Sequence, residues 1–303
     1  MRFSIAIPQQ AIGGRFDPEA LSGYLTRAEA LGFDGAWTME QVLSPTPVLG
    51  PLETLAFAAA STSTLRLGCA VLISTLHSPV HLAKSVTTLD HLSGGRIEVG
   101  VGSGGRRAFS AFGVDPESYL ARFTEGLALM KALWTEPEVH FDGRFWQLAG
   151  AAQEPKPVQR PAPPLWFGGS HPSALRRAVR LGDGFFGAGS QTTAQFAEQV
   201  PVVRRALAEE GRSDFRIAKR VYIAVDDDPA RAHGRMAAAL RAFYAAFAEG
   251  DLSPVAVTGR PDQCVDGLRA VADAGAEMIL LNPLFDEADQ MERLAADVMP
   301  HLG

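Results

Sequence analysis

The chain has few cysteines, and this shortage excludes several protein classes. Among 303 residues there are only Cys69 and Cys264, which lie far apart. Two distant cysteines provide neither a disulfide framework nor a CxxC site. The N-terminal stretch MRFSIAIPQQ is too short for a signal peptide or a membrane span. These features predict a cytoplasmic protein that has no membrane partner.

Positive charge is also scarce. The chain has 28 Lys and Arg against 34 Asp and Glu, a formal net charge of -6, and no run of basic residues. This balance argues against nucleic acid as a partner. The sequence contains no GxSxG elbow, no HExxH pair and no Walker loop. Glycine-rich loops without these motifs and without a strong acid–base set fit an enzyme in which a bound cofactor carries the difficult chemistry.

Apolar residues are abundant, and their pattern predicts the fold class. They make up 47% of the chain, enough for a large core. Short apolar runs alternate with amphipathic helical stretches, and we expect eight strands at 3–8, 33–39, 67–73, 97–101, 165–167, near 185, 216–225 and 278–281. Eight repeated β–α units imply parallel strands that close on themselves. We therefore predict an α/β protein, a (β/α)8 TIM barrel with insertions. A doubly wound open sheet stays as the alternative.

The helical stretches between these strands are expected at 17–31, 52–61, 80–92, 117–134, 172–181, 196–210, 230–249, 261–274 and 287–298. The segment at about 139–164 breaks the alternation, is rich in proline and contains HFDGRFWQL. Asp142-Gly143 is typical of a hairpin turn. We expect an insertion there, within one domain covering 1–303.

The stretch LDHLSGGRIEVGVGSGG predicts a strand followed by a glycine-rich loop. Glycine lets a backbone approach a ligand closely, and in α/β proteins ligands bind at the carboxyl ends of strands. Gly100, Gly102 and Gly105 form a GxGxxG pattern, the only support for a Rossmann-type NAD(P) dehydrogenase. That fingerprint opens directly into a helix. Here the next clear helix starts near Glu117, so the context opposes this alternative.

A second glycine turn, Gly168-Gly169-Ser170, precedes the expected helix at 172–181. Backbone N–H groups at a helix start bind anions, and the serine adds a hydroxyl, so the turn predicts a phosphate site. The alternative is a tight turn in which the serine only caps the helix.

Three polar residues near strand ends are candidate catalytic residues. Glu40 and Gln41 follow the second strand, and His77 lies in the loop after the third. A carboxylate at such a position is a site candidate, and the alternative is a solvated loop acid. His77 and His81 have the four-residue spacing of metal ligands, but Pro79 lies between them and no third ligand is near. We expect no metal site.

Several segments in order resemble the bacterial luciferase-like family of flavin- and deazaflavin-dependent oxidoreductases. They are EALGFDGAW, LRLGCAVLISTLHSPVHLAKSVTTLDHLSGGRIEVGVGSGG, HFDGRFWQL and PAPPLWFGGSHPSALRRAVRLGDGFF, and they span nearly the whole chain. The resemblance implies a (β/α)8 barrel, often dimeric, with FMN or coenzyme F420 across its C-terminal face. The short single-barrel form and the GVGSGG loop look more like the F420 branch.

The resemblance also implies where the cofactor lies. In the family a bulge in the third strand, often with a non-prolyl cis peptide, supports the back of the ring. The cofactor-binding positions implied here are Ala70 and Val71 with Ile73 nearby, Ser103 and Gly104 after the fourth strand, and Gly168, Gly169 and Ser170 at the phosphate end.

Two positions depart from the F420-dependent sugar-phosphate dehydrogenases that the chain resembles. Those enzymes carry Asp-His after the second strand, where this chain has Glu40-Gln41, and their catalytic glutamate corresponds to Gly105. Both departures remove titratable groups needed to take a proton from an alcohol. These departures argue against sugar-phosphate dehydrogenase activity, and the identity of the small organic substrate stays open.

The resemblance leads to one main hypothesis and two alternatives. The main one is hydride transfer between F420 and a small organic substrate, by a homodimer. The first alternative is an FMNH2-dependent monooxygenase that uses molecular oxygen. Its expected partner is a flavin reductase, whereas the expected partner under the main hypothesis is an F420 reductase. The second is a non-catalytic flavin-binding barrel.

Overall fold

The fold is a closed barrel of eight parallel strands. The computed structural model describes residues 1–10, 15–44, 46–245 and 250–302. The barrel strands are β1 (Arg2–Ala6), β2 (Gly35–Thr38), β3 (Arg66–Ile73), β4 (Ile97–Gly102), β7 (Leu165–Gly168), β8 (Gly184–Gly187), β9 (Arg216–Val225) and β11 (Met278–Asn282). They pair in this order, and β11 pairs in turn with β1, which closes the barrel. The TIM barrel is confirmed, and the open-sheet and Rossmann alternatives are wrong.

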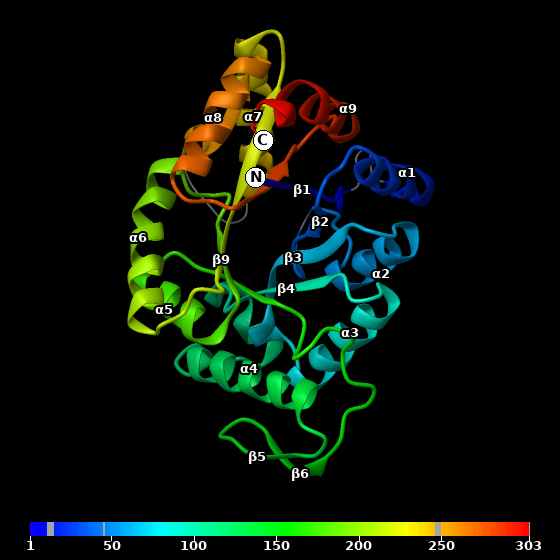
Figure 1. Cartoon of the computed structure of the whole chain (residues 1–303), viewed down its shortest axis with the longest axis vertical. Helices are drawn as coiled ribbons and strands as arrows, with labels where there is room; N and C mark the ends of the chain where they lie inside the picture. Colours follow the sequence, from blue (N-terminus) through cyan, green and yellow to red (C-terminus); the bar gives the residue numbers. More distant parts are fainter. Residues whose placement is uncertain (11–14, 45, 246–249, 303) are drawn as a thin grey trace.

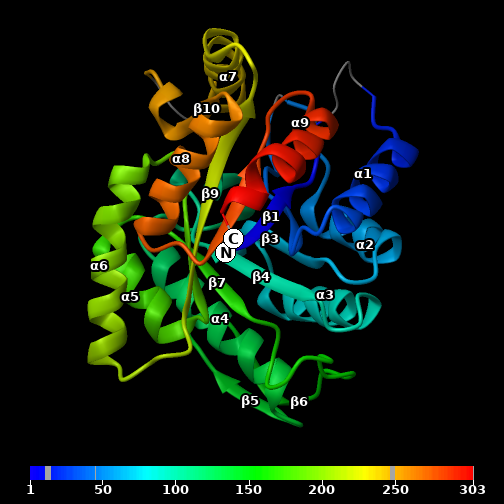
Figure 2. The ribbon, with the colours of Figure 1, turned by 45° about the horizontal axis from the view of Figure 1, so that its top comes forward.

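Helices surround the strands on the outside (Figures 1 and 2). They are α1 (Pro18–Ala30), α2 (Pro51–Ser61), α3 (Pro79–Leu92), α4 (Tyr119–Thr135), α5 (Pro172–Leu181), α6 (Thr193–Glu209), α7 (Pro229–Tyr244), α8 (Pro261–Asp273) and α9 (Glu287–Arg293). Six of them start with proline, whose fixed φ suits the first helical turn. Asp17 and Asp228 cap α1 and α7 by accepting backbone N–H bonds. These local signals explain why most helix starts were predictable.

The C-terminal part differs from expectation in three places. The helix expected at 287–298 is α9 followed by a π-helical turn, Leu294–Val298. The helix expected at 230–249 ends at Tyr244, and its last residues, 246–249, lie outside the described residues. An additional strand, β10 (Ala256–Gly259), pairs with the end of β9 outside the barrel. The ten-residue β9 therefore belongs to the barrel in its first half and to this outer pair in its second.

The predicted hairpin is present between β4 and β7. Strands β5 (Val139–Asp142) and β6 (Gln147–Ala151) pair antiparallel around Asp142-Gly143, away from the barrel (Figure 1). The Glu125 carboxylate on α4 accepts three backbone N–H bonds from 144–146, at 2.8 to 3.1 Å. These bonds tie the hairpin to the helix.

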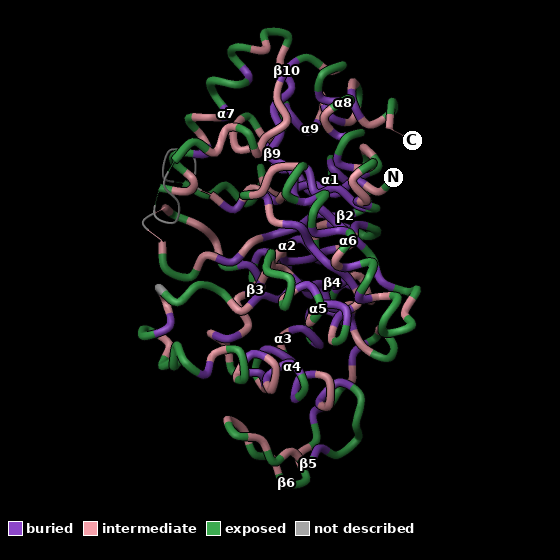
Figure 3. Tube along the Cα trace, turned by 90° about the vertical axis from the view of Figure 1, so that its left-hand side faces the viewer, coloured by how far each residue is buried: buried purple, intermediate pink, exposed green. Residues whose placement is uncertain are grey.

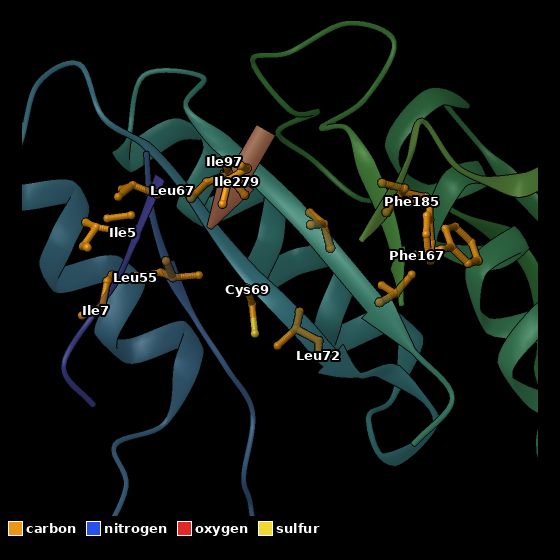
Figure 4. Packing of buried hydrophobic residues seen from close by; sticks show 14 of the residues in the cluster. Ile5, Ile7, Leu55, Leu67, Cys69, Leu72, Ile97, Phe167, Phe185 and Ile279 are labelled. Carbon is orange, nitrogen blue, oxygen red and sulfur yellow. The ribbon is translucent and has the colours of Figure 1, made fainter. Parts of the chain in front are cut away.

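Two apolar layers hold the barrel. The larger layer lies between strands and helices, where Leu67, Cys69 and Leu72 of β3 pack (Figure 4), and most residues of the barrel strands are buried (Figure 3). The smaller layer fills the barrel itself with Trp37, Trp166 and other large side chains. The Trp37 and Trp166 rings lie edge to face, 6.0 Å apart. Within the described residues, no helix has the length and apolar character needed to cross a membrane.

Candidate functional site

A bulge in β3 shapes the carboxyl end of the barrel. The pairing of β3 with β4 shifts register between Cys69 and Leu72, and the Ala70–Val71 peptide bond is cis. Both features are where the resemblance places them. The Val71 side chain faces glycines on two neighbouring strands. A Cβ atom would lie 2.8 Å from Val71 Cγ2 at Gly102 and 3.2 Å from Val71 Cγ1 at Gly168.

Several glycines are therefore needed first for packing. At Gly100 an added Cβ would collide with the Cys69 carbonyl oxygen, and at Gly104 with the Ile73 side chain. Protein interiors are close-packed, so these collisions cannot be absorbed without moving the strand. The fit of β4 against the bulge thus explains two glycines of the GxGxxG pattern, Gly100 and Gly102, whereas an added Cβ at Gly105 would meet nothing within 4 Å.

A cavity of about 320 Å³ lies beside the bulge. We call it the glycine cavity, and it is lined by Ala70, Val71, Gly102, Ser103, Gly104, Gly168, Gly169, Phe186, Gly187, Ala188, Gly189, Ser190, Arg220 and Tyr244. Six of the eight residues expected to bind a cofactor are among them. Ile73 is not, because it packs beneath Gly104. Ser170 is exposed and precedes α5.

The lining of the glycine cavity fits a flat ring system. Six lining residues are glycine, so much of the wall is bare backbone that a planar ligand can approach closely. Its volume lies within the usual range for small-molecule sites, roughly 300 to 1,000 Å³. At one end, the turn Gly168-Gly169-Ser170 leads into α5, but the first N–H groups of that helix are already bonded, since Pro172 has none and those of Ser173 and Ala174 donate to His171. His171, rather than Ser170, caps α5, because its Nδ1 accepts the Ser173 N–H at 3.2 Å.

Glu40 and His77 form a carboxylate–imidazole pair from two separate loops. Glu40 Oε1 lies 2.7 Å from His77 Nε2, and Oε2 accepts the backbone N–H of Ile73 at the end of the bulge. The Glu40 side chain is 2% exposed, so it is not a solvated loop acid, whereas His77 is 27% exposed. Because Nε2 faces the carboxylate, Nδ1 is the ring atom left to exchange a proton.

The structure thus brings together two of the three candidate catalytic residues, Glu40 and His77. Neither Glu40 nor His77 lines the glycine cavity. The pair contacts the end of the bulge through the Ile73 N–H, which donates to Glu40. Gln41 is not part of the pair, and its Oε1 is buried with no hydrogen-bond partner.

We expect Glu40→Ala to lower the free energy of unfolding by about 2 kcal/mol, because it leaves the partly buried Ile73 N–H without an acceptor. Glu138→Ala is a matched control, since Glu138 also bonds a histidine, His140, but on the surface. Its loss should cost less than about 0.5 kcal/mol. Urea unfolding followed by circular dichroism measures both. Equal effects would contradict the positioning role of Glu40.

Sequence reasoning missed two cations on β9. Lys219 is 1% exposed, and its Nζ donates to the backbone carbonyls of Ala188, Gln191 and Arg220 at 2.5, 2.9 and 3.0 Å. Burial, with a smaller contribution from neighbouring Arg220, lowers the pKa of Lys219 to about 7. The signal was present, because RIAKRVYIAV places two adjacent charges inside a strand that otherwise reads as buried.

Lys219 and Arg220 point to opposite sides of the strand, as alternation requires. Lys219 holds the loop after β8, part of which lines the glycine cavity. Arg220 itself lines that cavity. Within the described ranges, no group of three or more His, Cys, Asp or Glu side chains could hold a metal ion.

Comparison with known proteins agrees with this geometry. The chain is 30% identical to an F420-dependent glucose-6-phosphate dehydrogenase of Beutenbergia cavernae, covering 97% of this chain and 96% of that protein. A protein of the same name from Kineococcus radiotolerans is 31% identical over 74% of this chain and 69% of its own length.

Two solved structures share the fold at lower identity. They are the monooxygenase RslO1 from Streptomyces bottropensis (TM-score 0.88, 23% identity, all of both chains) and the F420-dependent tetrahydromethanopterin reductase from Methanopyrus kandleri (TM-score 0.81, 19% identity, 100% of this chain and 99% of that one). The luciferase-like monooxygenase family matches residues 1–278. The chain therefore belongs to the luciferase-like monooxygenase family.

Proposed function

We propose that this protein is an oxidoreductase that binds coenzyme F420 in the glycine cavity and transfers hydride between it and a small organic substrate. The observation that carries the proposal is the cavity itself, where glycines of β4, β7 and β8 face the Ala70–Val71 bulge. The names of the two dehydrogenase relatives support F420 as the cofactor.

The residues present fit a deazaflavin. Ala70 and Val71 would support one face of the ring, Ser103 and Gly104 would border it, and Gly168 and Gly169 would lie toward the phosphate. The Ser170 hydroxyl would complete the phosphate end, and Ile73 would support the backbone at Gly104, against which it packs. When bound, F420 supplies the hydride chemistry, while the protein orients the reactants and excludes water.

A hydride transferred to a carbonyl or alkene carbon leaves negative charge that must receive a proton. In the proposal the Glu40–His77 pair is a positioning group, because Glu40 holds the end of the bulge through the Ile73 N–H and fixes the His77 ring through Nε2. Gln41 would act as a neutral hydrogen-bonding group. An alcohol-oxidising role is disfavoured, because the position of the relatives' glutamate is Gly105, which has open space around it. We therefore do not extend the relatives' sugar-phosphate activity to this chain.

The second candidate is an FMNH2-dependent monooxygenase, which the fold likeness to the monooxygenase RslO1 favours. It would need a flavin reductase as partner. The homodimer, the reductase partner, the cytoplasmic location and the single domain over 1–303 stay predictions.

Titration of the protein with F420 and with FMN, followed by cofactor fluorescence, tests the proposal. We expect F420 to bind roughly tenfold or more tightly than FMN, the difference that one or two good polar contacts supply. The reverse order would support the monooxygenase, and binding of neither would support a non-catalytic barrel.

The Ser103→Trp variant tests the location of the cofactor, because a bulky ring there would fill part of the glycine cavity. Its affinity for F420 should fall roughly tenfold or more. The control is Ser110→Trp, at an exposed position in the following 3-10 helix, Arg106–Phe112, which should leave affinity unchanged. Unchanged binding in the Ser103→Trp variant would place the cofactor elsewhere.

A further inference from the structure

Arg220 lies where two cavities meet. Besides the glycine cavity, it lines a small second cavity at the mouth of the barrel, formed by Ala6, Ile7, Pro8, Gln9, Gln10, Trp37, Thr38, Met39, Arg220, Phe243, Asn282, Pro283, Leu284 and Glu287. Of the described residues, it alone lines both. A molecule in contact with the cofactor ring and the barrel mouth would therefore pass this side chain.

The charge of Arg220 is buried and incompletely partnered. The residue is 9% exposed, and its Nε is buried without a hydrogen-bond partner. Among the described residues, no carboxylate lies within ion-pair distance of the guanidinium. A buried cation without an anion costs several kcal/mol, unless a ligand completes the site.

The neighbours of Arg220 do not supply that anion. Lys219 is a second cation, although its ammonium is directed to backbone carbonyls on the other side of the strand. Tyr222 lies beside Arg220 near Gly189, and its hydroxyl is hydrogen-bonded to that of Tyr244 at 2.7 Å. Phenols with raised pKa stay neutral, and burial holds the pKa of Tyr222 well above its usual value.

We propose that Arg220 binds the carboxylate of the substrate, and that the substrate is a small organic acid with an apolar body. A planar guanidinium matches a carboxylate through two parallel hydrogen bonds. Ala70 and Phe186 of the glycine cavity offer apolar surface for that body, and the second cavity, of about 40 Å³, takes only a short end of it beside Trp37 and Phe243. This inference rests on the proposed function, since it places the reacting carbon between Arg220 and the cofactor.

The test uses benzoate and benzamide, which share a shape but differ in charge, titrated into the F420-loaded protein while cofactor fluorescence is followed. Benzoate should bind roughly tenfold more tightly than benzamide to the unmodified protein. Arg220→Met should abolish that preference, and its F420 affinity is determined in the same titration. Arg220→Lys keeps the charge without the planar fork and should retain part of the preference. Arg205→Met, at an exposed position on α6, is the matched control for loss of one charge.

Absence of a benzoate preference in the unmodified protein would overturn the proposal. An Arg220→Met variant that loses F420 affinity but keeps the preference for benzoate would also overturn it. Arg220 would then bind an anionic oxygen of the cofactor and not the carboxylate of the substrate. If F420 itself does not bind, the proposed function fails separately. Benzoate and benzamide are then compared on the unloaded protein through tryptophan fluorescence, since Trp37 lines the mouth. Should Arg220→Met not fold, Arg220→Gln replaces it in the same comparison.

Discussion

Replacing Gly100 with alanine should lower the free energy of unfolding by about 3 kcal/mol or more, the upper range for overpacking in a core. An added Cβ would strike the Cys69 carbonyl oxygen, which is backbone and cannot rotate away. Strand β4 would have to move from β3 where the bulge forms, and the wall of the glycine cavity would move with it. Urea unfolding measures the stability, and F420 fluorescence measures the expected loss of affinity.

Gly105→Ala is the matched control, five residues along the same segment. Its φ of -99° is accessible to alanine, and nothing lies within 4 Å of the added Cβ. We expect its stability to stay within about 0.5 kcal/mol of the unmodified protein. Equal stability of the two variants would contradict the close contact between β3 and β4 at Gly100.

The stability of the protein should rise with pH above about 7, and Lys219→Met should remove most of that rise. The pKa of Lys219 is about 7 in the folded chain, against 10.5 for an ordinary lysine. Between these values the unfolded chain binds more protons, so the free energy of unfolding increases with pH. The increase is about 1.4 kcal/mol per pH unit. Below pH 7 both states carry the charge, and the contribution no longer changes.

The measurement is urea unfolding at pH 7 and pH 9 for both proteins. The unmodified protein should gain about 2 kcal/mol more than Lys219→Met between these conditions. The exposed Lys84 also donates to a backbone carbonyl, so Lys84→Met serves as the control and should keep the full rise. Parallel curves for the unmodified protein and Lys219→Met would show that another group titrates.

Lys219→Met should also weaken F420 binding, because it leaves the carbonyls of Ala188 and Gln191 without their donor. Their loop contributes to the glycine cavity. Both losses are expressed as free energies, of F420 binding and of unfolding, and compared with those of Lys84→Met. A larger loss in binding than in unfolding would show that Lys219 positions this loop and does not only stabilise the fold.

Much of the barrel was predictable because its strands and helices carry local signals. β-branched runs such as that of β4 and proline at helix starts are encoded over a few residues. Strand β10 was missed for the opposite reason. It contains the strand formers Val257 and Thr258 but is only four residues long, and it forms a strand because the overhanging end of β9 offers a partner.

The site was less predictable because its contacts join distant residues. The pairing of Glu40 with His77 spans 37 positions and depends on how two loops meet at the bulge. No spacing rule predicts such a contact. Arg220 and Lys219 could have been found, since charges inside a buried run conflict with the pattern and such conflicts concentrate at functional sites. The role of the bulge came from the resemblance alone.

The space occupied by Val71 is shared among three strands. Its methyl groups fill the volume that side chains on β4 and β7 would otherwise occupy. Residues in contact show non-additive effects when substituted together. During sequence divergence, position 71 and the glycines at 102 and 168 therefore form an epistatic group. A larger residue can enter β4 or β7 only in a background where position 71 has already become smaller, so the order of substitutions constrains which barrels of this kind can evolve.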